Sequence, residues 1–359
     1  MGIDSRTGAK PVKKRRVALV VGLVSAVAAF GLTACGAGSS PSGPVDGPWA
    51  DVVAAANKEG KVTIYSTQAE PRLGALEAAF EAKYPQIDMQ VVRGVDADIL
   101  SKIDAEVRSG KGIGDVAVTT DVSWIQANSD NDAAVKLVGP AFDEPAYNRA
   151  TTVVDDRFFL EGAVVLGLGW NTQAIPQGVK KPQDLLDPAL KGKIGIVSPG
   201  TSTTYLDYYA HLEKYYGGRD FLKKIAAQKP RIYPSSQPLG QAVASGEISA
   251  GLMTDPMLPS KEAGAPVEWT AGEHVWGAKW NGMALGSSPN PNAAQVLADF
   301  MVTPEGQATT SVGYAAALPD IEGSIENAQG IGDQNLDVTV GADGQKYRNE
   351  LEQLFTSGR

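Results

Sequence analysis

The strongest constraint on the fold is an alternation of short apolar strands with amphipathic helices. Strand patterns occur in order at residues 61–66, 87–94 and 115–120. Between the first two, Leu73, Leu76 and Phe80 recur at helical spacing, and a second helix pattern precedes the third strand. Strands separated by helices of this length need crossover connections. We therefore predict an α/β fold with mixed sheets and helices on both faces.

The same alternation restarts after residue 158. Its strand patterns lie at 159–171, 191–200, 231–236 and 248–255, with helices at about 201–216, 219–228 and 237–245. Another strand pattern at 282–288 is followed by helices at 292–302, 304–312 and 345–355. A chain of this length exceeds one ordinary hydrophobic core, so we predict two lobes.

The only cysteine of the chain, Cys35, follows a segment that is typical of secretion. Four basic residues at 13–16 precede an uncharged run at 17–32 and the small pair Thr33-Ala34, an order that predicts a signal peptide over residues 1–34. Leu32-Thr33-Ala34-Cys35 resembles the lipobox of bacterial lipoproteins, in which the cysteine is lipidated. The alternative is an uncleaved anchor helix with an incidental cysteine. Either form tethers the protein outside the cytoplasmic membrane.

The charge balance argues against nucleic acid as a partner. The formal charge of −9 becomes −14 without residues 1–34, because that segment holds six basic residues and one acidic residue. Phosphate neutralisation needs clustered cations, and the remaining sequence has no stripe of lysine and arginine. We therefore expect no nucleic-acid partner.

Six segments carry a family resemblance. They read "KVTIYSTQAEP", "LEAAFEAKYPQIDMQVVRG", "GDVAVTTDVSW", "LLDPALKGKIGIVSPG", "YPSSQPLGQAVASGEISAGLM" and "AAQVLADFMVTPEGQ". In this order they resemble the solute-binding proteins of bacterial ABC importers, in the class that includes the ferric-ion binders. The resemblance implies a two-lobed, type 2 periplasmic-binding-protein fold, with a hinge between the lobes and closure around a ligand.

The resemblance also implies how the chain is divided. We expect a signal peptide at 1–34, a flexible Gly/Ser/Pro-rich tether at 35–48, lobe 1 at 49–165 completed by about 283–320, lobe 2 at 166–282 and a C-terminal helical tail at 321–359. The expected partners are a small solute, the transmembrane subunits of an ABC permease and, through lipid on Cys35, the membrane. The expected location is the extracellular face of the cell membrane, as a monomer.

Ligands of open α/β sheets bind at the carboxyl ends of the strands, where loops and helix N-termini present free N–H groups. The candidate ligand-binding residues are accordingly those that follow the predicted strands. They are Ser66, Thr67, Gln68, Glu70, Thr120, Asp121, Trp170, Asn171, Ser198, Thr201, Ser202, Thr203, Ser235, Ser236, Thr254 and Asp255.

Each group of candidates also has a purely structural interpretation. The hydroxyls at 198–204 suit an anion at a helix N-terminus, or they cap that helix. Glu70, Asp121 and Asp255 suit hydroxyls, amines or cations, or they cap helices. Lys279 is a possible counter-ion or a solvated lysine. Four tryptophans are possible stacking platforms or core residues, namely Trp124, Trp170, Trp276 and Trp280.

A ferric site of the kind that the resemblance implies is not expected. The family's ferric binders use a tandem tyrosine after the strand matched by "ISAGLM", and Pro256-Met257 occupies that position here. Proline offers no oxygen ligand for hard Fe(III). Tyr208-Tyr209 and Tyr215-Tyr216 belong to a helix and are not the family's pair, so an iron site would need other tyrosines, such as Tyr205 or Tyr314, as stand-ins. We expect no metal and no cofactor.

Enzymatic motifs are missing from the sequence. The chain has two histidines, His211 and His274, and lacks a Gly-x-Ser-x-Gly elbow, a P-loop and a His-Glu-x-x-His helix. We predict a non-enzymatic, lipid-anchored solute-binding protein for a small polar organic solute, phosphorylated or zwitterionic. The alternatives are a ferric-iron receptor with atypical ligands and a surface lipoprotein without a transport role.

Overall fold

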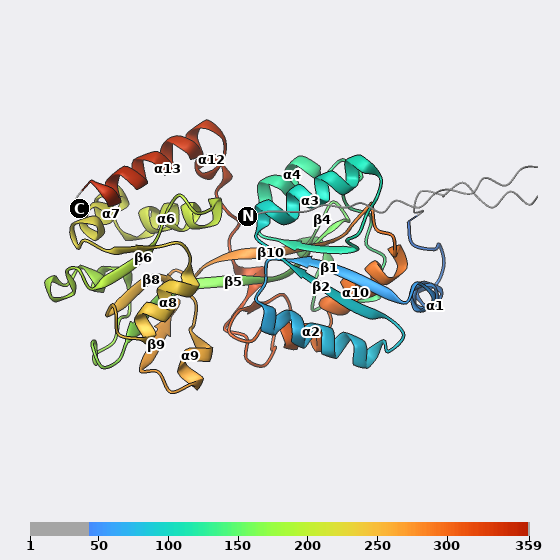
Figure 1. The fold of residues 1–359 in the computed structure, drawn as a ribbon, viewed down its shortest axis with the longest axis horizontal. Coiled ribbons are helices and arrows are strands. Elements are labelled where there is room, and N and C mark those ends of the chain that lie inside the picture. Colours follow the sequence, from blue (N-terminus) through green and yellow to red (C-terminus); the bar gives the residue numbers. More distant parts are fainter. Residues whose placement is uncertain (1–42, 358–359) are drawn as a thin grey trace, which may run out of the picture. The chain divides into compact units, whose positions relative to one another are not determined.

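The computed structural model describes residues 43–357, and the structural statements below refer to that part of the chain. Predictions for the signal peptide, for Cys35 and for the start of the tether lie outside the described residues. Helices and strands carry the labels of Figure 1.

A parallel sheet begins the first lobe. Its elements are α1 (Trp49–Glu59), β1 (Lys61–Ser66), α2 (Glu70–Lys83), β2 (Asp88–Arg93), α3 (Asp96–Ser109), β3 (Val116–Thr119) and α4 (Val122–Asn128). Strand β1 pairs in parallel with β2 and with β3. Figure 1 shows α2 on one side of this sheet and α3 with α4 on the other. The strands β1 and β3 are almost fully buried, as expected for a sheet covered on both faces.

Two long strands connect the lobes. After α5 (Arg149–Thr152) and β4 (Val153–Val154), strand β5 (Phe158–Asn171) pairs antiparallel with β10 (Trp276–Ala284) through Leu166. From Gly167 onwards β5 pairs with β8 and β9 of the second lobe, while β10 also pairs with β3 of the first. Both strands are therefore shared by the lobes (Figure 1).

The strand predicted at 282–288 is displaced along the chain. The strand expected at 282–288 begins at Trp276 and ends at Ala284. Its centre alternates between buried and partly exposed residues, with Lys279 and Asn281 on the more open side. These polar residues interrupt the apolar run, so the start of the strand was not predicted from the sequence.

The second lobe has its own sheet. Its elements are β6 (Ile194–Val197), α6 (Thr203–Tyr216), α7 (Gly218–Ala227), β7 (Arg231–Tyr233), α8 (Ser236–Ala244), β8 (Ala250–Thr254), α9 (Leu258–Glu262) and β9 (Val267–Thr270). Strand β6 pairs in parallel with β7 and β8, and the strand order across both lobes is β2-β1-β3-β10-β5-β8-β6-β7. The predicted helix at about 201–216 is α6.

The chain then contributes to both lobes in turn. The remaining elements are α10 (Pro291–Met301), α11 (Pro304–Thr310), β11 (Ala315–Ala316), β12 (Glu326–Asn327), α12 (Leu336–Thr339) and α13 (Gly341–Thr356). Phe300 of α10 is buried with Phe80 in the first-lobe core, whereas Phe355 of α13 is buried with Tyr209 in the second-lobe core. A third cluster around Tyr65 and Ile103 covers the other face of the first-lobe sheet, because neighbouring strand residues point to opposite faces. The predicted two-lobed α/β fold is confirmed.

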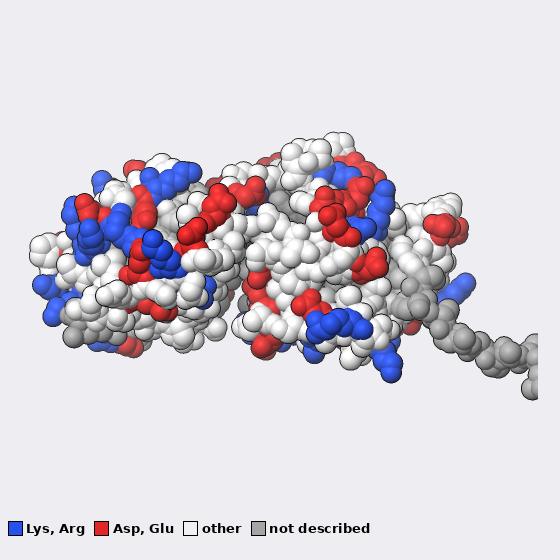
Figure 2. All heavy atoms as spheres, turned by 90° about the horizontal axis from the view of Figure 1, so that it is seen from above, with Lys and Arg blue, Asp and Glu red and all other residues white. Residues whose placement is uncertain are grey.

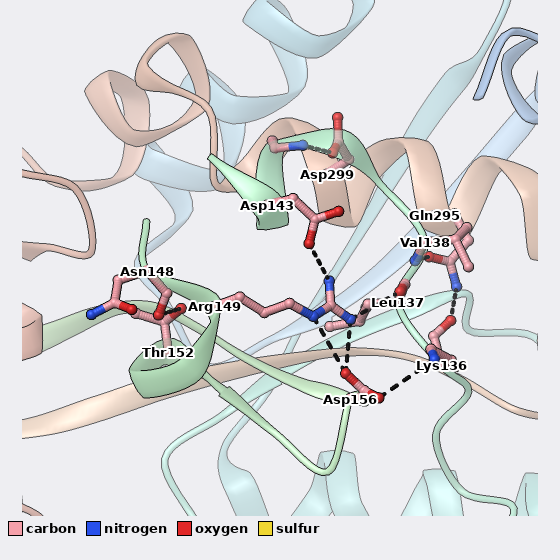
Figure 3. A network of polar contacts seen from close by, with 11 residues as sticks. Lys136, Leu137, Val138, Asp143, Asn148, Arg149, Thr152, Asp156, Gln295 and Asp299 are labelled. Atoms are coloured by element: carbon pink, nitrogen blue, oxygen red, sulfur yellow. Dashed lines mark hydrogen bonds and ion pairs between the residues drawn. The ribbon is translucent and has the colours of Figure 1, made fainter. Parts of the chain in front are cut away.

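A polar network attaches a long loop of the first lobe to α10 (Figure 3). The guanidinium of Arg149 donates to Asp156 at 3.0 Å, to Asp143 at 3.3 Å and to the carbonyl of Leu137 at 3.2 Å. Asp299 of α10 accepts from the backbone N–H of Ala141 at 2.6 Å. The loop approaches so closely at Gly139 that an added Cβ would lie 2.2 Å from Oδ1 of Asp299.

The carboxyl of Asp299 should make stability depend on pH. Burial raises its pKa from the ordinary 3.8 to about 6. The folded state therefore binds this proton more tightly than the unfolded state, and the group's contribution to stability falls as pH rises between these two values. Asp299→Asn keeps an oxygen for the N–H of Ala141. We expect the variant to gain about 2 to 3 kcal/mol relative to the parent between about pH 4 and pH 7, measured by urea unfolding. A difference that does not change with pH would contradict this expectation.

Candidate functional site

A cavity of about 710 Å³ lies between the two lobes. The first lobe contributes the ends of β1, β2 and β3, the start of α2 and the segment that follows α11, whereas the second contributes the starts of α6 and α8 and the turn between β8 and α9. Side chains from β5 and β10 form part of its wall. The carboxyl ends of the parallel strands of both sheets thus meet here, as expected for a ligand site in this class of fold.

Seven of the predicted residues line this cavity. They are Thr67, Gln68, Thr120, Ser202, Ser235, Ser236 and Asp255. Thr120 of the first lobe lies 3.5 Å from Thr204 of the second, measured between the hydroxyl oxygens. The backbone N–H of Ser236 donates to the hydroxyl of Tyr205 at 3.0 Å. The cavity therefore presents hydroxyl groups from both lobes.

Three predicted residues are used in local structure instead. Asp121 caps α4 by accepting from the N–H of Trp124 at 3.0 Å. Ser66 is fully buried and its hydroxyl lies 3.2 Å from Oε1 of Gln68. Thr254 is also fully buried at the end of β8. For Asp121 the contact supports the helix-cap interpretation, whereas Ser66 and Thr254 are the last, buried residues of their strands.

Trp170 and Asn171 lie at the opposite end of the second lobe from the cavity. Strand β5 runs antiparallel to β8, and Trp170 pairs with Ala250 at the amino end of β8. The amide of Asn171 donates to the carbonyl of Val243 at 3.2 Å and its oxygen accepts from the N–H of Gln173 at 3.0 Å. The rule that ligands lie after strands applies to parallel strands, so it misplaced these two residues.

Residues 198–201, which form the turn after β6, do not line the cavity. Ser198 accepts from the N–H of Gly200 at 3.3 Å, and a Cβ added at Gly200 would lie 2.0 Å from the side chain of Glu352 on α13. The hydroxyl of Ser202, which does line the cavity, accepts from the N–H of Tyr205 at 3.2 Å. Four predicted residues, Glu70, Ser198, Thr201 and Thr203, are not brought to the cavity.

Two arginines that were not predicted line the cavity from the first lobe. Arg93 is the last residue of β2 and donates from Nε to the carbonyl of Gln68 at 2.9 Å. Arg72 lies in the first turn of α2 and is 8% exposed. The signal for Arg93 was present in the sequence, because it ends a predicted parallel strand. Arg72 had no such signal, since the helix that carries it begins at Glu70.

Arg72 is held in place and still has a free donor. Its Nη2 donates to the carbonyl of Val312 at 2.9 Å, and its guanidinium carbon lies 3.1 Å from the ring centroid of Tyr314 and 5.3 Å from that of Trp280. Nη1 is buried without a hydrogen-bond partner. Burial lowers the pKa of Arg72 to about 10, while Tyr314, Glu161 and Asp255 raise it. The group stays cationic at neutral pH, and a buried cation with a free donor calls for an anion.

Asp255 faces the same cavity from the second lobe. Its Oδ1 accepts from the backbone N–H of Met257 at 3.0 Å. Burial raises the pKa of its carboxyl, and the bond from Met257 and the charge of Arg72 both act in the opposite direction. Among the described residues Asp255 forms no ion pair within 4.0 Å, so its charge and that of Arg72 remain separate within one cavity.

The tyrosines give little support to a ferric site. Tyr208 and Tyr209 are buried within α6, and the turn that follows β8 contains Pro256 and Met257 and no tyrosine. Tyr205 and Tyr314 do line the cavity, but burial raises the pKa of Tyr314, which opposes the phenolate that Fe(III) prefers. Within residues 43–357, no three His, Cys, Asp or Glu side chains gather closely enough to hold a metal ion.

Most of the tryptophans that could stack on a ligand have structural roles instead. The indole N–H of Trp124 donates to Asp104 at 3.1 Å, and that of Trp276 donates to Asp207 at 2.8 Å. Lys279 forms an ion pair with Asp333 at 2.7 Å. Of the four candidate tryptophans, Trp280 is the one that lines the cavity.

A second cavity of about 530 Å³ lies between α6, the start of β10 and the C-terminal segment. Several of its polar groups are paired: Asp207 accepts from Trp276 and from the N–H of Asn335, and Asp333 pairs with Lys279 beside the cavity. The larger cavity, with unpaired charged groups from two lobes, is the better candidate site.

The fold and this cavity define the class of protein. Two α/β lobes that share two strands and enclose a polar cavity form a receptor for a small molecule. The chain belongs to the bacterial extracellular solute-binding protein family, whose model matches residues 62–311. The family and the fold are those of periplasmic binding proteins of the ABC-transporter type. In the described part of the chain, no helix combines the length and the apolar character that a membrane span requires.

Solved structures show the same fold. A substrate-binding protein of an ABC transporter from Agrobacterium tumefaciens has a TM-score of 0.68 and 14% identity, with 84% of this chain and 96% of that chain covered. Iron-bound HitA from Pseudomonas aeruginosa matches this chain with a TM-score of 0.61 and 20% identity, and the match covers 82% of this chain and 99% of that chain. AfuA from Actinobacillus pleuropneumoniae, with fructose-6-phosphate bound, has a TM-score of 0.59 and 20% identity, with 83% and 97% covered. The predicted resemblance to binding proteins related to the ferric-ion binders is confirmed.

Proposed function

We propose that the protein captures a small polar organic solute with an anionic group and delivers it to the permease of an ABC importer. The observation that carries this proposal is Arg72, a buried cation in the cavity whose Nη1 has no partner. Arg93 adds a second positive charge, and hydroxyls such as Thr120 and Ser236 offer hydrogen bonds to the rest of the solute. Guanidinium groups match carboxylate and phosphate oxygens in geometry and charge.

Closure of the lobes would complete the site. The crossing strands β5 and β10 form the hinge, and lobe 1 at 49–165 with about 283–320 closes against lobe 2 at 166–282. The separate apolar cores of the two lobes support movement as two bodies. The tail at 321–359 places α13 on the core of the second lobe, through Leu351 and Phe355. In this role the protein is a monomer without a cofactor and performs no catalysis.

The chain is also proposed to be a lipoprotein. Residues 1–34 form the signal peptide, Cys35 carries the lipid, and residues 35–48 tether the lobes to the extracellular face of the membrane. A lipid anchor keeps a receptor close to its permease. Nucleic acid is not a partner, and Figure 2 supports this on the face that it shows, where acidic and basic side chains are interspersed over both lobes.

A panel of solutes tests the proposal. Thermal unfolding of the protein is followed with gamma-aminobutyrate, aminoethylphosphonate, fructose-6-phosphate and ferric citrate, each at increasing concentration. An organic anion should raise the unfolding temperature, since a ligand at a hundredfold excess over Kd stabilises by about 2.7 kcal/mol. Stabilisation by ferric iron alone, with a tyrosinate-to-iron colour, would replace the proposal with the ferric receptor. A protein partner or enzymatic turnover without solute binding would favour the non-transport lipoprotein.

A further inference from the structure

The charged groups of the cavity are divided between the lobes. Arg72 and Arg93, its two arginines, both belong to the first lobe. Two of its three carboxylates, Asp255 and Glu262, belong to the second lobe and lie on the turn and helix that follow β8. The cavity therefore has a cationic wall and an anionic wall.

The third carboxylate, Asp96, belongs to the first lobe, and both of its oxygens accept hydrogen bonds from groups of that lobe. Its Oδ1 accepts from the hydroxyl of Thr119 and from the N–H of Thr120 at 3.1 Å, and its Oδ2 accepts from the hydroxyl of Thr120 at 2.8 Å. Asp96 therefore shapes the end of β3. Asp255 accepts one backbone hydrogen bond, at Oδ1, and no described residue donates to its Oδ2.

The position of Asp255 is held by an unusual backbone. Met253 and Met257, two residues before and two after, have positive φ angles of 76° and 51°. Non-glycine residues adopt this region rarely, and the surrounding structure must enforce it. The packing there is close, because a Cβ added at Gly240 would lie 3.1 Å from the side chain of Met257 and 3.9 Å from Oδ1 of Asp255. The carboxylate is thus fixed on the cavity wall.

This distribution of charge distinguishes between a purely anionic solute and a zwitterionic one. A purely anionic solute would satisfy Arg72 but would leave the carboxylate of Asp255 without a counter-charge in a site that loses water on closure. Enclosing an unpaired charge is unfavourable, and a like charge nearby makes it worse. A solute with an ammonium group would neutralise Asp255 at the same time as its anionic group neutralises Arg72.

We infer that the natural solute is a zwitterion, with its anionic group against Arg72 and Arg93 of the first lobe and its ammonium group against Asp255 of the second. This inference rests on the proposed function and names the substrate class for the same cavity. The solute bridges the two lobes through opposite charges, so binding both groups favours the closed form. Asp255 is then the residue that selects amino compounds over simple anions.

Matched pairs of probes test the role of Asp255. Affinities of the full lipid-free chain for aminoethylphosphonate and ethylphosphonate, and for gamma-aminobutyrate and butyrate, are measured by calorimetry for the parent and for Asp255→Asn. The control variant Asp220→Asn removes an exposed carboxylate from α7 of the same lobe, outside the cavity. The parent should bind at least one amino compound about 30-fold more tightly than its matched anion, as expected for an enclosed charge pair. Asp255→Asn should remove most of that preference, and Asp220→Asn should keep it.

The outcomes separate the inference from the proposed function. Equal affinity of the parent for both members of every pair, or an unchanged preference in Asp255→Asn, would overturn the zwitterion while anion binding itself stays in place. Tighter binding of fructose-6-phosphate than of any amino compound would also overturn it. Circular dichroism shows whether Asp255→Asn is folded. If it is unfolded, Asp255→Glu, which keeps the charge, provides the comparison and should retain a preference for the amino compound. Loss of that preference in a folded Asp255→Glu counts against the inference.

Discussion

Replacing Arg72 with glutamine should nearly abolish solute binding. Arg72 lines the cavity and is a largely buried cation there, so an anionic group of the solute would pair with its guanidinium. Loss of one partner from an enclosed, hydrogen-bonded charge pair costs about 2 to 5 kcal/mol, which corresponds to a roughly 30-fold to several-thousand-fold weaker Kd. Calorimetric titration with the solute that stabilises the parent most strongly measures this effect. Arg72→Lys keeps the charge without the planar guanidinium, so its affinity for the solute should lie between those of the parent and Arg72→Gln.

The control for this experiment must separate binding from folding. Arg72 also packs on Tyr314 and donates to the carbonyl of Val312, so its replacement changes the protein without solute as well. Arg108→Gln, at an exposed position at the end of α3 in the same lobe, is the matched control and should bind as the parent does. If folded Arg72→Gln binds the solute with parental affinity, the anionic site does not involve this residue and the proposed function loses its main support.

Replacing Phe300 with alanine should cause a larger loss of stability than any of the other substitutions proposed for this protein. Phe300 is fully buried on α10, with its ring centroid 5.5 Å from that of Phe80 and 6.3 Å from that of Tyr84. Truncation of a buried phenylalanine removes apolar contacts and leaves a cavity, at a cost of about 3 to 5 kcal/mol. Urea unfolding followed by far-ultraviolet circular dichroism measures the change in the free energy of unfolding.

A second apolar truncation provides the comparison for Phe300. Val154 on β4 is 51% exposed, so Val154→Ala should change stability by less than about 0.5 kcal/mol. Because the two lobes have separate cores, the loss in Phe300→Ala should be concentrated in the first lobe. A loss of less than about 1 kcal/mol would mean that the region around α10 refills the space, and would contradict the tight packing inferred for this core.

The strand and helix pattern of the sequence was sufficient to predict the fold class. Burial on both faces produces nearly continuous apolar strands such as β1 and β3, and Leu73, Leu76 and Phe80 recur at helical spacing and are buried in α2. Strand and helix patterns of this kind depend only on residues that are close together in the sequence. The pattern was weaker in β10, where Lys279 and Asn281 interrupt the apolar run, and its start was misplaced for that reason.

The candidate site was less predictable because it depends on strand direction. Residues after parallel strands, such as Thr67, Thr120 and Asp255, do line the cavity. Trp170 and Asn171 are the last two residues of β5, which runs antiparallel to β8, and they lie at the end of the second-lobe sheet that is away from the cavity. Direction within a sheet is a property of the whole topology, and no local pattern in residues 158–171 records it.

The sequence alone determined the α/β class, because strand and helix patterns depend on neighbouring residues. The expectation of two lobes came from the length of the chain and from the family resemblance. Only the tertiary structure decided which charges share one cavity. Along the chain, most of the first lobe and most of the second lobe lie between Arg72 and Asp255, and the strands β5 and β10, which both lobes share, bring the two residues to one cavity. A binding site depends on how far apart its side chains lie in space. Pairing of the strands sets those distances, and spacing along the chain does not specify them.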